Sequence, residues 1–264
     1  MEATALTEQT SHQKIRSRLA RGECAFGTFL KISSLASVEA VGLSGFDFCI
    51  IDLEHGPFSF ERAENMVRAA ELVGLSAIIR TFDTRPHTLV RALDTGCEGV
   101  LVPNLTSRRE AEAVVHGARF HPLGGRGMDP FARAARYGTI AKEEYFARSN
   151  EETLVGVMIE GTEGLRNLPE ILEVKGIDLV FVGPYDLSQS VGVPGQVQAP
   201  AVQDRVAEIV AAARDAGVTV GIYADGVSDA CRWCDVGIRC VATSVDVRIL
   251  LDGCRAIVDA LANR

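Results

Sequence analysis

Two acidic residues follow two consecutive apolar runs of the sequence. Glu160 ends the run at 155–160 (VGVMIE), and Asp186 ends the run at 179–186 (LVFVGPYD). The stretch at 161–178 reads as a loop and one amphipathic helix, so the two runs are predicted to be consecutive strands. A parallel barrel places consecutive strand ends side by side at its mouth, where both carboxylates would face one open site. Two hard oxygen ligands, with other positions left to water and substrate, suit a catalytic Mg²⁺- or Mn²⁺-type ion.

Other predicted strands also end in polar residues. His55 follows the second strand, together with Asp52 and Glu54, and Arg80 ends the third. A histidine titrates near neutrality and could move a proton, and a guanidinium is a permanent cation with a planar fork of donors. Each of these residues, taken alone, has a structural explanation. The histidine could be a loop residue, the arginine could be an ion-pair partner, and the carboxylates could be helix N-caps. Their combination at successive strand ends favours a catalytic site.

The spacing of apolar runs predicts a (β/α)₈ TIM barrel, formed as a single domain over residues 1–264. The runs are continuously apolar, as expected for a parallel sheet covered on both faces, and helical patterns lie between them. A doubly wound sheet remains an alternative, although no G-x-G-x-x-G follows the first strand. The predicted strands are 27–31, 46–55, 76–81, 99–104, 153–160, 177–186, 219–224 and 239–246.

Two segments depart from this repeat. Residues 1–22 form a polar, partly helical N-terminal segment without the apolar stretch of a signal peptide. Residues 120–150 form an insertion between strands four and five, rich in glycine and arginine at its start. We expect the insertion at the C-terminal face of the barrel, as part of a lid or a subunit contact. Its arginines could attract an anionic acceptor, although solvated or interface arginines are the commoner case.

Composition excludes some classes of protein. The net charge of −8 argues against a nucleic-acid binder, and no run of about 18 apolar residues predicts a membrane span. Cys231 and Cys234 form a CxxC, but no second pair follows at zinc-finger spacing, and their helical context favours a packing role. The seven cysteines are odd in number and scattered, which indicates reduced thiols and a cytoplasmic protein.

Several segments together resemble the HpcH/HpaI aldolase family, the metal-dependent class II pyruvate aldolases. The similarity extends from about Gly27 to Asp246. It implies a (β/α)₈ fold and a divalent ion, Mg²⁺, Mn²⁺ or Co²⁺, held by Glu160 and Asp186. The segments are IDLEHGPFS, AIIRT, RALDTGCEGVLVPN, HPLGGRGMDPFARAARY, MIEG and FVGPYDLSQSVGVPG.

The resemblance also implies roles for individual residues. His55 paired with Asp94 would be the acid/base machinery, and Arg80 would bind the keto-acid. Members of the family are typically homohexamers, arranged as trimers of dimers, that exchange or pack the last helix, here 247–262. The residues expected to bind substrate are Phe29, Arg80, Pro184, Tyr185 and Asp186.

Three positions differ from the usual family pattern. Met158 stands where relatives have a glutamine two residues before the metal-binding glutamate. Tyr185 replaces the alanine of GPADLS, and Phe29 stands where many relatives have a tryptophan near the aldehyde pocket. These differences concern the acceptor more than the metal or pyruvate.

The expected reaction is reversible cleavage of a 4-hydroxy-2-oxo acid into pyruvate and an aldehyde. An alternative is oxaloacetate decarboxylation, or another C–C bond formation of the kind that macrophomate synthase performs. A third is a catalytically silent barrel that binds keto-acids. A Schiff-base mechanism is weakly supported, because Lys31 is the one lysine on a predicted strand. The expected partners are small molecules and further copies of the chain.

Overall fold

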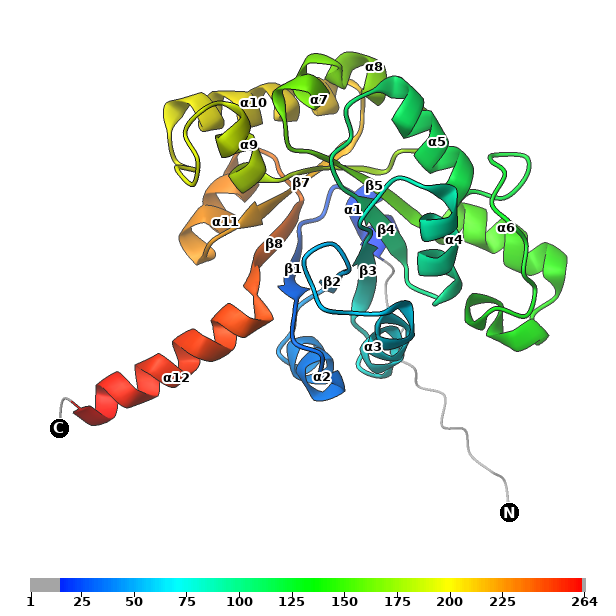
Figure 1. Ribbon diagram of the computed structural model, residues 1–264, viewed down its shortest axis with the longest axis horizontal. Coiled ribbons are helices and arrows are strands. Elements are labelled where there is room, and N and C mark those ends of the chain that lie inside the picture. The colour runs from blue at the N-terminus through cyan, green and yellow to red at the C-terminus, as the bar shows by residue number, and fades with distance from the viewer. Residues whose placement is uncertain (1–14, 263–264) are drawn as a thin grey trace.

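Eight parallel strands close into a barrel in the computed structural model, which describes residues 15–262 (Figure 1). Each strand pairs with the next along the chain, and β8 pairs with β1 to close the ring. The (β/α)₈ barrel expected from the sequence is therefore confirmed, and the doubly wound alternative is excluded. The strands are β1 (Ala25–Leu30), β2 (Phe48–Asp52), β3 (Ser76–Arg80), β4 (Gly99–Val102), β5 (Leu154–Ile159), β6 (Leu179–Val182), β7 (Thr219–Ala224) and β8 (Cys240–Val245).

Helices surround the barrel and return the chain from the end of one strand to the start of the next. Left-handed glycines end several of them, as the sequence predicted: Gly176 (φ 104°) and Gly217 (φ 70°) stand shortly before β6 and β7. The helices are α1 (Ile15–Ala20), α2 (Leu35–Leu43), α3 (Phe60–Leu72), α4 (Pro86–Asp94), α5 (Arg108–Ala118), the 3₁₀ helix η1 (Arg133–Gly138), α6 (Lys142–Glu152), α7 (Thr162–Arg166), α8 (Leu168–Leu172), α9 (Pro184–Ser190), α10 (Pro200–Asp215), α11 (Val227–Asp235) and α12 (Asp246–Ala262).

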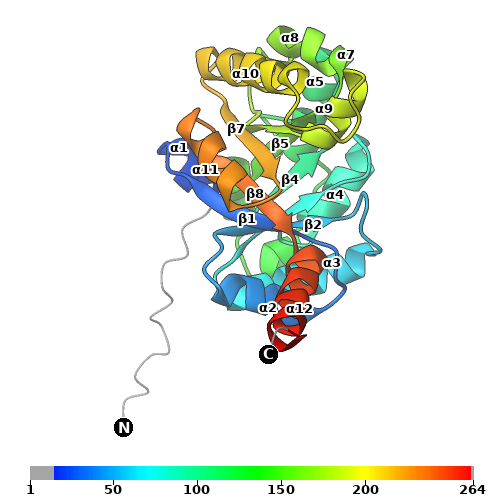
Figure 2. The same ribbon diagram turned by 90° about the vertical axis from the view of Figure 1, so that its left-hand side faces the viewer.

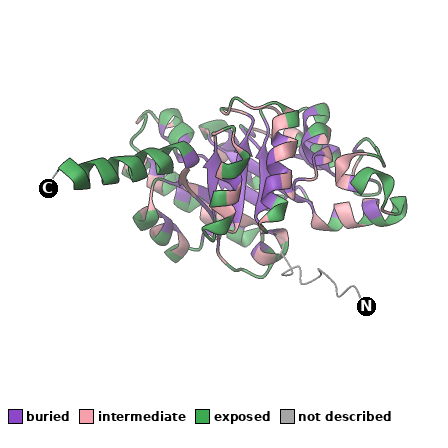
Figure 3. Ribbon diagram, turned by 90° about the horizontal axis from the view of Figure 1, so that it is seen from below, coloured by how far each residue is buried: buried purple, intermediate pink, exposed green. Residues whose placement is uncertain are grey.

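The strands are largely buried (Figure 3), and apolar side chains pack on both sides of them. Inside the barrel, Phe48, Ile50 and Phe181 belong to one cluster, which Ile15 and Leu19 of α1 also join. The alternate strand residues belong to a second cluster that joins the sheet to the surrounding helices. Burial on both faces explains why the strands are continuously apolar in sequence.

The insertion lies at the opposite end of the barrel from the one expected. A helix of a βα barrel runs back to the N-terminal face, and residues 120–150 follow α5. Two ion pairs hold the segment against the last turns of neighbouring helices. Arg126 Nη2 lies 2.7 Å from Asp94 Oδ1 of α4, and Arg133 Nη2 lies 2.5 Å from Glu71 Oε2 of α3. The predicted position over the mouth was wrong, because the preceding helix had already carried the chain away from it.

The last helix projects from the barrel (Figures 1 and 2). Its first residue, Asp246, is buried and accepts hydrogen bonds from the backbone N–H groups of Lys31 and Ile32. The rest of α12 is exposed along its length. The large apolar side chains on it that are exposed are Val247, Ile249, Leu250, Leu251, Ile257, Val258 and Leu261.

Most of the predicted N-terminal segment 1–22 lies outside the described residues. All seven cysteines are free, and Cys234 packs against the outer core from α11, whereas Cys231 is exposed. Within residues 15–262, no helix has the length and apolar character needed to cross a membrane.

Candidate active site

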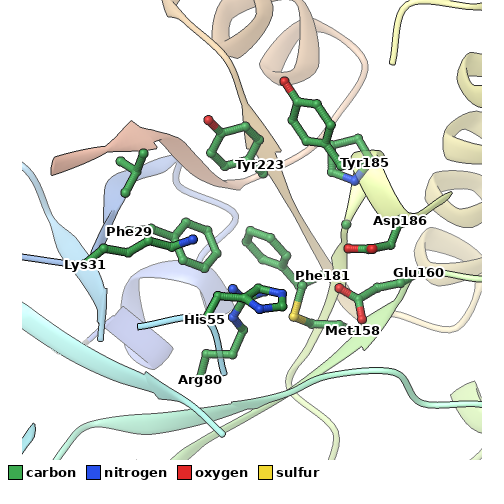
Figure 4. A pocket seen from close by; sticks show the side chains of 13 residues that line it. Phe29, Lys31, His55, Arg80, Met158, Glu160, Phe181, Tyr185, Asp186 and Tyr223 are labelled. Carbon is green, nitrogen blue, oxygen red and sulfur yellow. The ribbon is translucent and has the colours of Figure 1, made fainter. Parts of the chain in front are cut away.

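A cavity of about 310 Å³ opens at the C-terminal ends of the strands (Figure 4). This is the end at which βα barrels carry their catalytic residues, and the volume lies at the lower end of small-molecule sites. Glu160, Asp186, His55 and Arg80, all predicted from the sequence, line it together. The complete lining is Phe29, Lys31, His55, Arg80, Met158, Glu160, Phe181, Gly183, Pro184, Tyr185, Asp186, Tyr223 and Val245.

Glu160 is a buried carboxylate directly after β5, and it is 4% exposed. Its Oε2 accepts a hydrogen bond of 2.9 Å from the backbone N–H of Asn104, which follows β4. Asn104 has a φ of 54°, a left-handed conformation that asparagine tolerates better than most residues. Gly183 stands on the other side, where a Cβ would lie 2.6 Å from Glu160 Oε1. The backbone around Glu160 therefore fixes its position.

Asp186 lies beside Glu160 at the mouth, in the first turn of α9 (Figure 4). Burial, together with the charges of Glu54 and Asp186, raises the pKa of Glu160 to about 7, although the bond from Asn104 opposes this. Neighbouring carboxylates destabilise one another's ionised forms, which a cation between them would relieve. The pKa of Glu54 is also raised, by burial and then by nearby acids, despite the opposing charge of Arg80.

Arg80 is the central cation of the site, and two carboxylates hold it. Its Nε and Nη2 donate to the two oxygens of Asp52 at 2.9 and 2.8 Å. Its Nη1 lies 3.1 Å from Glu54 Oε2, an ion pair without hydrogen-bond alignment, since that oxygen has no hydrogen-bond partner within residues 15–262. Burial raises the pKa of Asp52, but the bond and charge of Arg80 outweigh it, so the net pKa lies below its ordinary value. The guanidinium is thus locked in orientation before any substrate arrives.

His55 occupies the turn after β2, and its side chain is 58% exposed. Its backbone N–H donates to Asp52 Oδ1 at 3.1 Å, the carboxylate that also holds Arg80. Its Nε2 lies 4.0 Å from Glu54 Oε2. The imidazole therefore borders the cavity on the side of Arg80, with access to solvent for proton exchange.

Asp94 is not brought to His55 within one chain. It ends α4, and the last turn of such a helix lies at the N-terminal face, away from the strand ends. There its carboxylate binds Arg126 and is partly buried. Burial raises the pKa of Asp94, and the bond from Arg126 opposes that effect. The role that the family resemblance implies for Asp94 stays a prediction about the assembled protein.

Sequence reasoning missed part of the cavity wall. Tyr223 and Val245 come from the ends of β7 and β8. Lys31, named from the sequence only as a possible Schiff-base lysine, follows β1 directly and also lines the cavity. Phe181 is fully buried inside the barrel and reaches the cavity floor. Each lies at or close to a strand end, which is a usable signal, but an aromatic or aliphatic residue there looks the same as a core residue in the sequence.

The residues present fit a divalent ion. Within residues 15–262, no group of three or more histidine, cysteine or acidic side chains is arranged as a complete metal site. The pair of neighbouring carboxylates instead leaves positions for substrate and water, as a hard catalytic ion requires. The raised pKa of Glu160, caused by burial and by the charges of Glu54 and Asp186, indicates excess negative charge here. Because a resident cation would compensate that charge, Glu160 and Asp186 are suitable ligands.

Comparison with known proteins agrees with this geometry. Residues 25–252 match the family model for HpcH/HpaI aldolase/citrate lyase. The chain belongs to this family. Its members include carbon–carbon lyases, and this chain is an enzyme of that class. A 4-hydroxy-2-oxo-heptane-1,7-dioate aldolase of Shigella flexneri is 32% identical over 249 residues, which cover 94% of this chain and 92% of that protein.

Two further relatives extend the comparison. A 2-dehydro-3,6-dideoxy-6-sulfogluconate aldolase of Pseudomonas putida is 30% identical over 246 residues, with 93% of this chain and 96% of that protein covered. A crystal structure of an HpcH/HpaI family protein from Burkholderia cenocepacia J2315 superposes with a TM-score of 0.89 at 30% identity. That match covers 94% of this chain and 98% of the other.

Proposed function

We propose that this HpcH/HpaI family member is a divalent-metal-dependent aldolase that reversibly cleaves a 4-hydroxy-2-oxo acid into pyruvate and an aldehyde. The observation that carries the proposal is the juxtaposition of Glu160 and Asp186 at the mouth, with Arg80 facing the same cavity. Aldolase relatives at about 30% identity over nearly the whole chain support the same reaction class.

The aldol reaction needs negative charge to be stabilised on the ketone oxygen of pyruvate. A Mg²⁺, Mn²⁺ or Co²⁺ ion held by Glu160 and Asp186 would act as a Lewis acid toward that oxygen. Arg80, fixed by Asp52 and Glu54, donates to the ketone or carboxylate oxygen from the other side.

His55 is proposed as the base. In the cleavage direction it accepts the proton of the C4 hydroxyl, the C3–C4 bond breaks, and C3 of the departing pyruvate gains a proton. In the addition direction, His55 removes a proton from the pyruvate methyl group. The first turn of α9 begins at Pro184, which has no N–H, and supplies the backbone N–H groups of Tyr185 and Asp186 for the substrate carboxylate. Phe29 borders the acceptor.

Asp94 is proposed to support His55 only in an assembly of several chains. Within one chain it binds Arg126 at the far face, so a neighbouring copy would have to bring the two residues together. A homo-oligomer, in the family's hexameric form, is also supported by α12, which is exposed along its length (Figure 3) and carries several large apolar side chains. Packing that helix against another copy, or exchanging it, would bury them. Free cysteines throughout support a cytoplasmic setting.

The decisive assay follows pyruvate release from 4-hydroxy-2-oxo acids of several chain lengths. We expect turnover to disappear with EDTA and return on adding Mg²⁺ or Mn²⁺, and metal-independent turnover would refute the proposal. Glu160→Gln should abolish Mn²⁺ binding, whereas Glu163→Gln, an exposed acid one turn away, should not. Oxaloacetate serves as the comparison substrate, because preferential release of CO₂ from it would favour the decarboxylase alternative.

Deuterium exchange at the pyruvate methyl group provides a second readout. The metal-loaded enzyme should exchange these protons without any aldehyde, since proton removal from C3 precedes bond formation. A silent barrel that only binds keto-acids would leave the methyl signal unchanged.

A further inference from the structure

One side of the cavity is built from aromatic rings. The rings of Phe29 and Tyr223 have centroids 6.0 Å apart, as do those of Tyr185 and Tyr223. Phe29 also meets Phe181 edge to face at 6.2 Å. Phe29 and Tyr223 lie on β1 and β7, which barrel closure places on either side of β8. Phe181 lies on β6, and Tyr185 follows that strand in the first turn of α9. We call these four residues the aromatic wall: Phe29, Phe181, Tyr185 and Tyr223.

The hydroxyl groups of the two tyrosines lie toward the rim of the cavity. Tyr185 Oη donates to Asp225 Oδ1 at 2.7 Å. Figure 4 shows both hydroxyl groups pointing away from Glu160. Both side chains therefore present mainly their rings to the cavity.

The cations that line the cavity are already paired. Arg80 binds Asp52 and Glu54, and Lys31 Nζ lies 3.7 Å from Asp52 Oδ2. Apart from Glu160 and Asp186, whose charge the divalent ion would compensate, the acids around the cavity are Asp52, Glu54 and Asp225. Among the described residues of one chain, these pairings leave no uncommitted cation at the cavity for a second anionic group on the substrate.

The insertion does not supply the missing charge from the same chain. Arg126 and Arg133 are paired with Asp94 and Glu71 at the far face of the barrel. The possibility that these arginines attract an anionic acceptor is thus not supported within one chain.

The acceptor must reach C3 of pyruvate from the unoccupied part of the cavity. Pyruvate placed between the carboxylate pair and Arg80 leaves the space along the aromatic wall and Val245. Aromatic side chains bind an aromatic ligand ring through stacking and edge-to-face contacts. A saturated ring of similar size does not gain this additional binding free energy.

We infer that the acceptor of this enzyme is a neutral aromatic aldehyde, whose ring lies against the aromatic wall. The inference rests on the proposed aldolase function and specifies its substrate class. In the bond-forming direction, C3 of pyruvate loses a proton and attacks the aldehyde carbon, and the aldehyde oxygen gains a proton. The product is a 4-aryl-4-hydroxy-2-oxobutanoate. The relatives named above are named for substrates with a second anionic group, a dioate and a sulfonate.

The test compares acceptors on the full-length, Mn²⁺-loaded enzyme. Benzaldehyde, cyclohexanecarbaldehyde and succinic semialdehyde present an aromatic ring, a saturated ring and a carboxylate. We expect kcat/KM for benzaldehyde to be about tenfold or more higher than kcat/KM for succinic semialdehyde. We also expect it to be a few-fold higher than kcat/KM for cyclohexanecarbaldehyde, on the order of one aromatic contact. Equal or better use of succinic semialdehyde would overturn the inference.

Two variants test whether the aromatic wall causes the preference for an aromatic acceptor. Tyr223→Leu keeps apolar volume but removes a ring, and should lower the ratio of kcat/KM for benzaldehyde to that for cyclohexanecarbaldehyde. Tyr185→Phe keeps the ring and loses the bond to Asp225, and should preserve the ratio. A purely structural role for Tyr223 would lower both rates equally, which would contradict the inference.

Deuterium exchange at the pyruvate methyl group distinguishes failure of the acceptor inference from failure of the proposed aldolase function. If wild-type enzyme exchanges pyruvate protons but prefers succinic semialdehyde, the aromatic acceptor is wrong and the aldolase proposal stands. If it neither exchanges protons nor cleaves hydroxy-keto acids, both are overturned.

Discussion

The backbone of Gly183 runs against the carboxylate of Glu160, so that a Cβ at Gly183 would lie 2.6 Å from Glu160 Oε1 and 2.9 Å from its Cγ. Gly183 has a φ of −92°, which any residue adopts, so the close approach rather than backbone strain requires glycine here. The last residue before α9 thereby sets the position of a carboxylate that follows β5.

Gly183→Ala should therefore weaken metal binding. The methyl group displaces Glu160, and losses of support around a metal ligand typically cost about 10–100-fold in affinity. Titration with Mn²⁺, followed by electron paramagnetic resonance, measures the change. Gly161→Ala is the matched control, because a Cβ there meets nothing within 4 Å. Unchanged Mn²⁺ affinity in Gly183→Ala would show that the backbone at Gly183 does not position a metal ligand.

Arg80→Ala should lose both activity and stability. Removal of an oxyanion-type donor costs about 2–4 kcal/mol in kcat/KM. Leaving Asp52 buried without its partner costs about 3–5 kcal/mol in the free energy of unfolding, which urea denaturation measures. Adding Asp52→Asn to this variant should recover part of the stability but none of the activity. Recovery of both together would mean that Arg80 acts only as a structural cation.

The low pKa of Asp52 predicts a specific loss of stability in acid. Because Arg80 holds that pKa below the unfolded value, the stabilisation from Asp52 is complete above about pH 4 and is lost as pH falls through the folded-state pKa. Wild type should exceed Asp52→Asn in unfolding free energy at pH 5, and the difference should shrink toward pH 3. A difference that grows on acidification would contradict the assignment.

Asp94→Asn separates two roles of one carboxylate. The ion pair with Arg126 predicts a lower urea midpoint for the variant. If an assembled enzyme also brings Asp94 to His55, kcat falls as well, because the imidazole loses the carboxylate that orients it. We expect both changes. A stability loss with an unaltered kcat would confine Asp94 to the first role.

Because α12 exposes apolar residues, we expect oligomer formation to depend on them. Leu250→Asp combined with Ile257→Asp places charges on that face and should lower the molar mass measured by light scattering. Arg255→Asp changes a polar position of the same helix and should leave the mass unaltered. An unaltered mass in the double variant would show that α12 does not join subunits.

The sequence by itself determined the barrel and the carboxylate pair. The local periodicity of apolar residues defines the strands and helices. Few folds bury both faces of a sheet that is built from repeated βα units, and the closed barrel is one of them. Because consecutive strands of a barrel are neighbours, Glu160 after β5 and Asp186 after β6 had to share a mouth. His55 and Arg80 followed by the same rule.

Only the tertiary structure decided the contacts between segments that are distant in the sequence. Closure of β1 on β8 brings Phe29 to Tyr223, far away in the chain, to form the aromatic wall. The return direction of the helices separates Asp94 from His55 and places the insertion at the far face. Such contacts depend on closure and on helix direction rather than on local pattern, so residue types and spacing alone do not contain them.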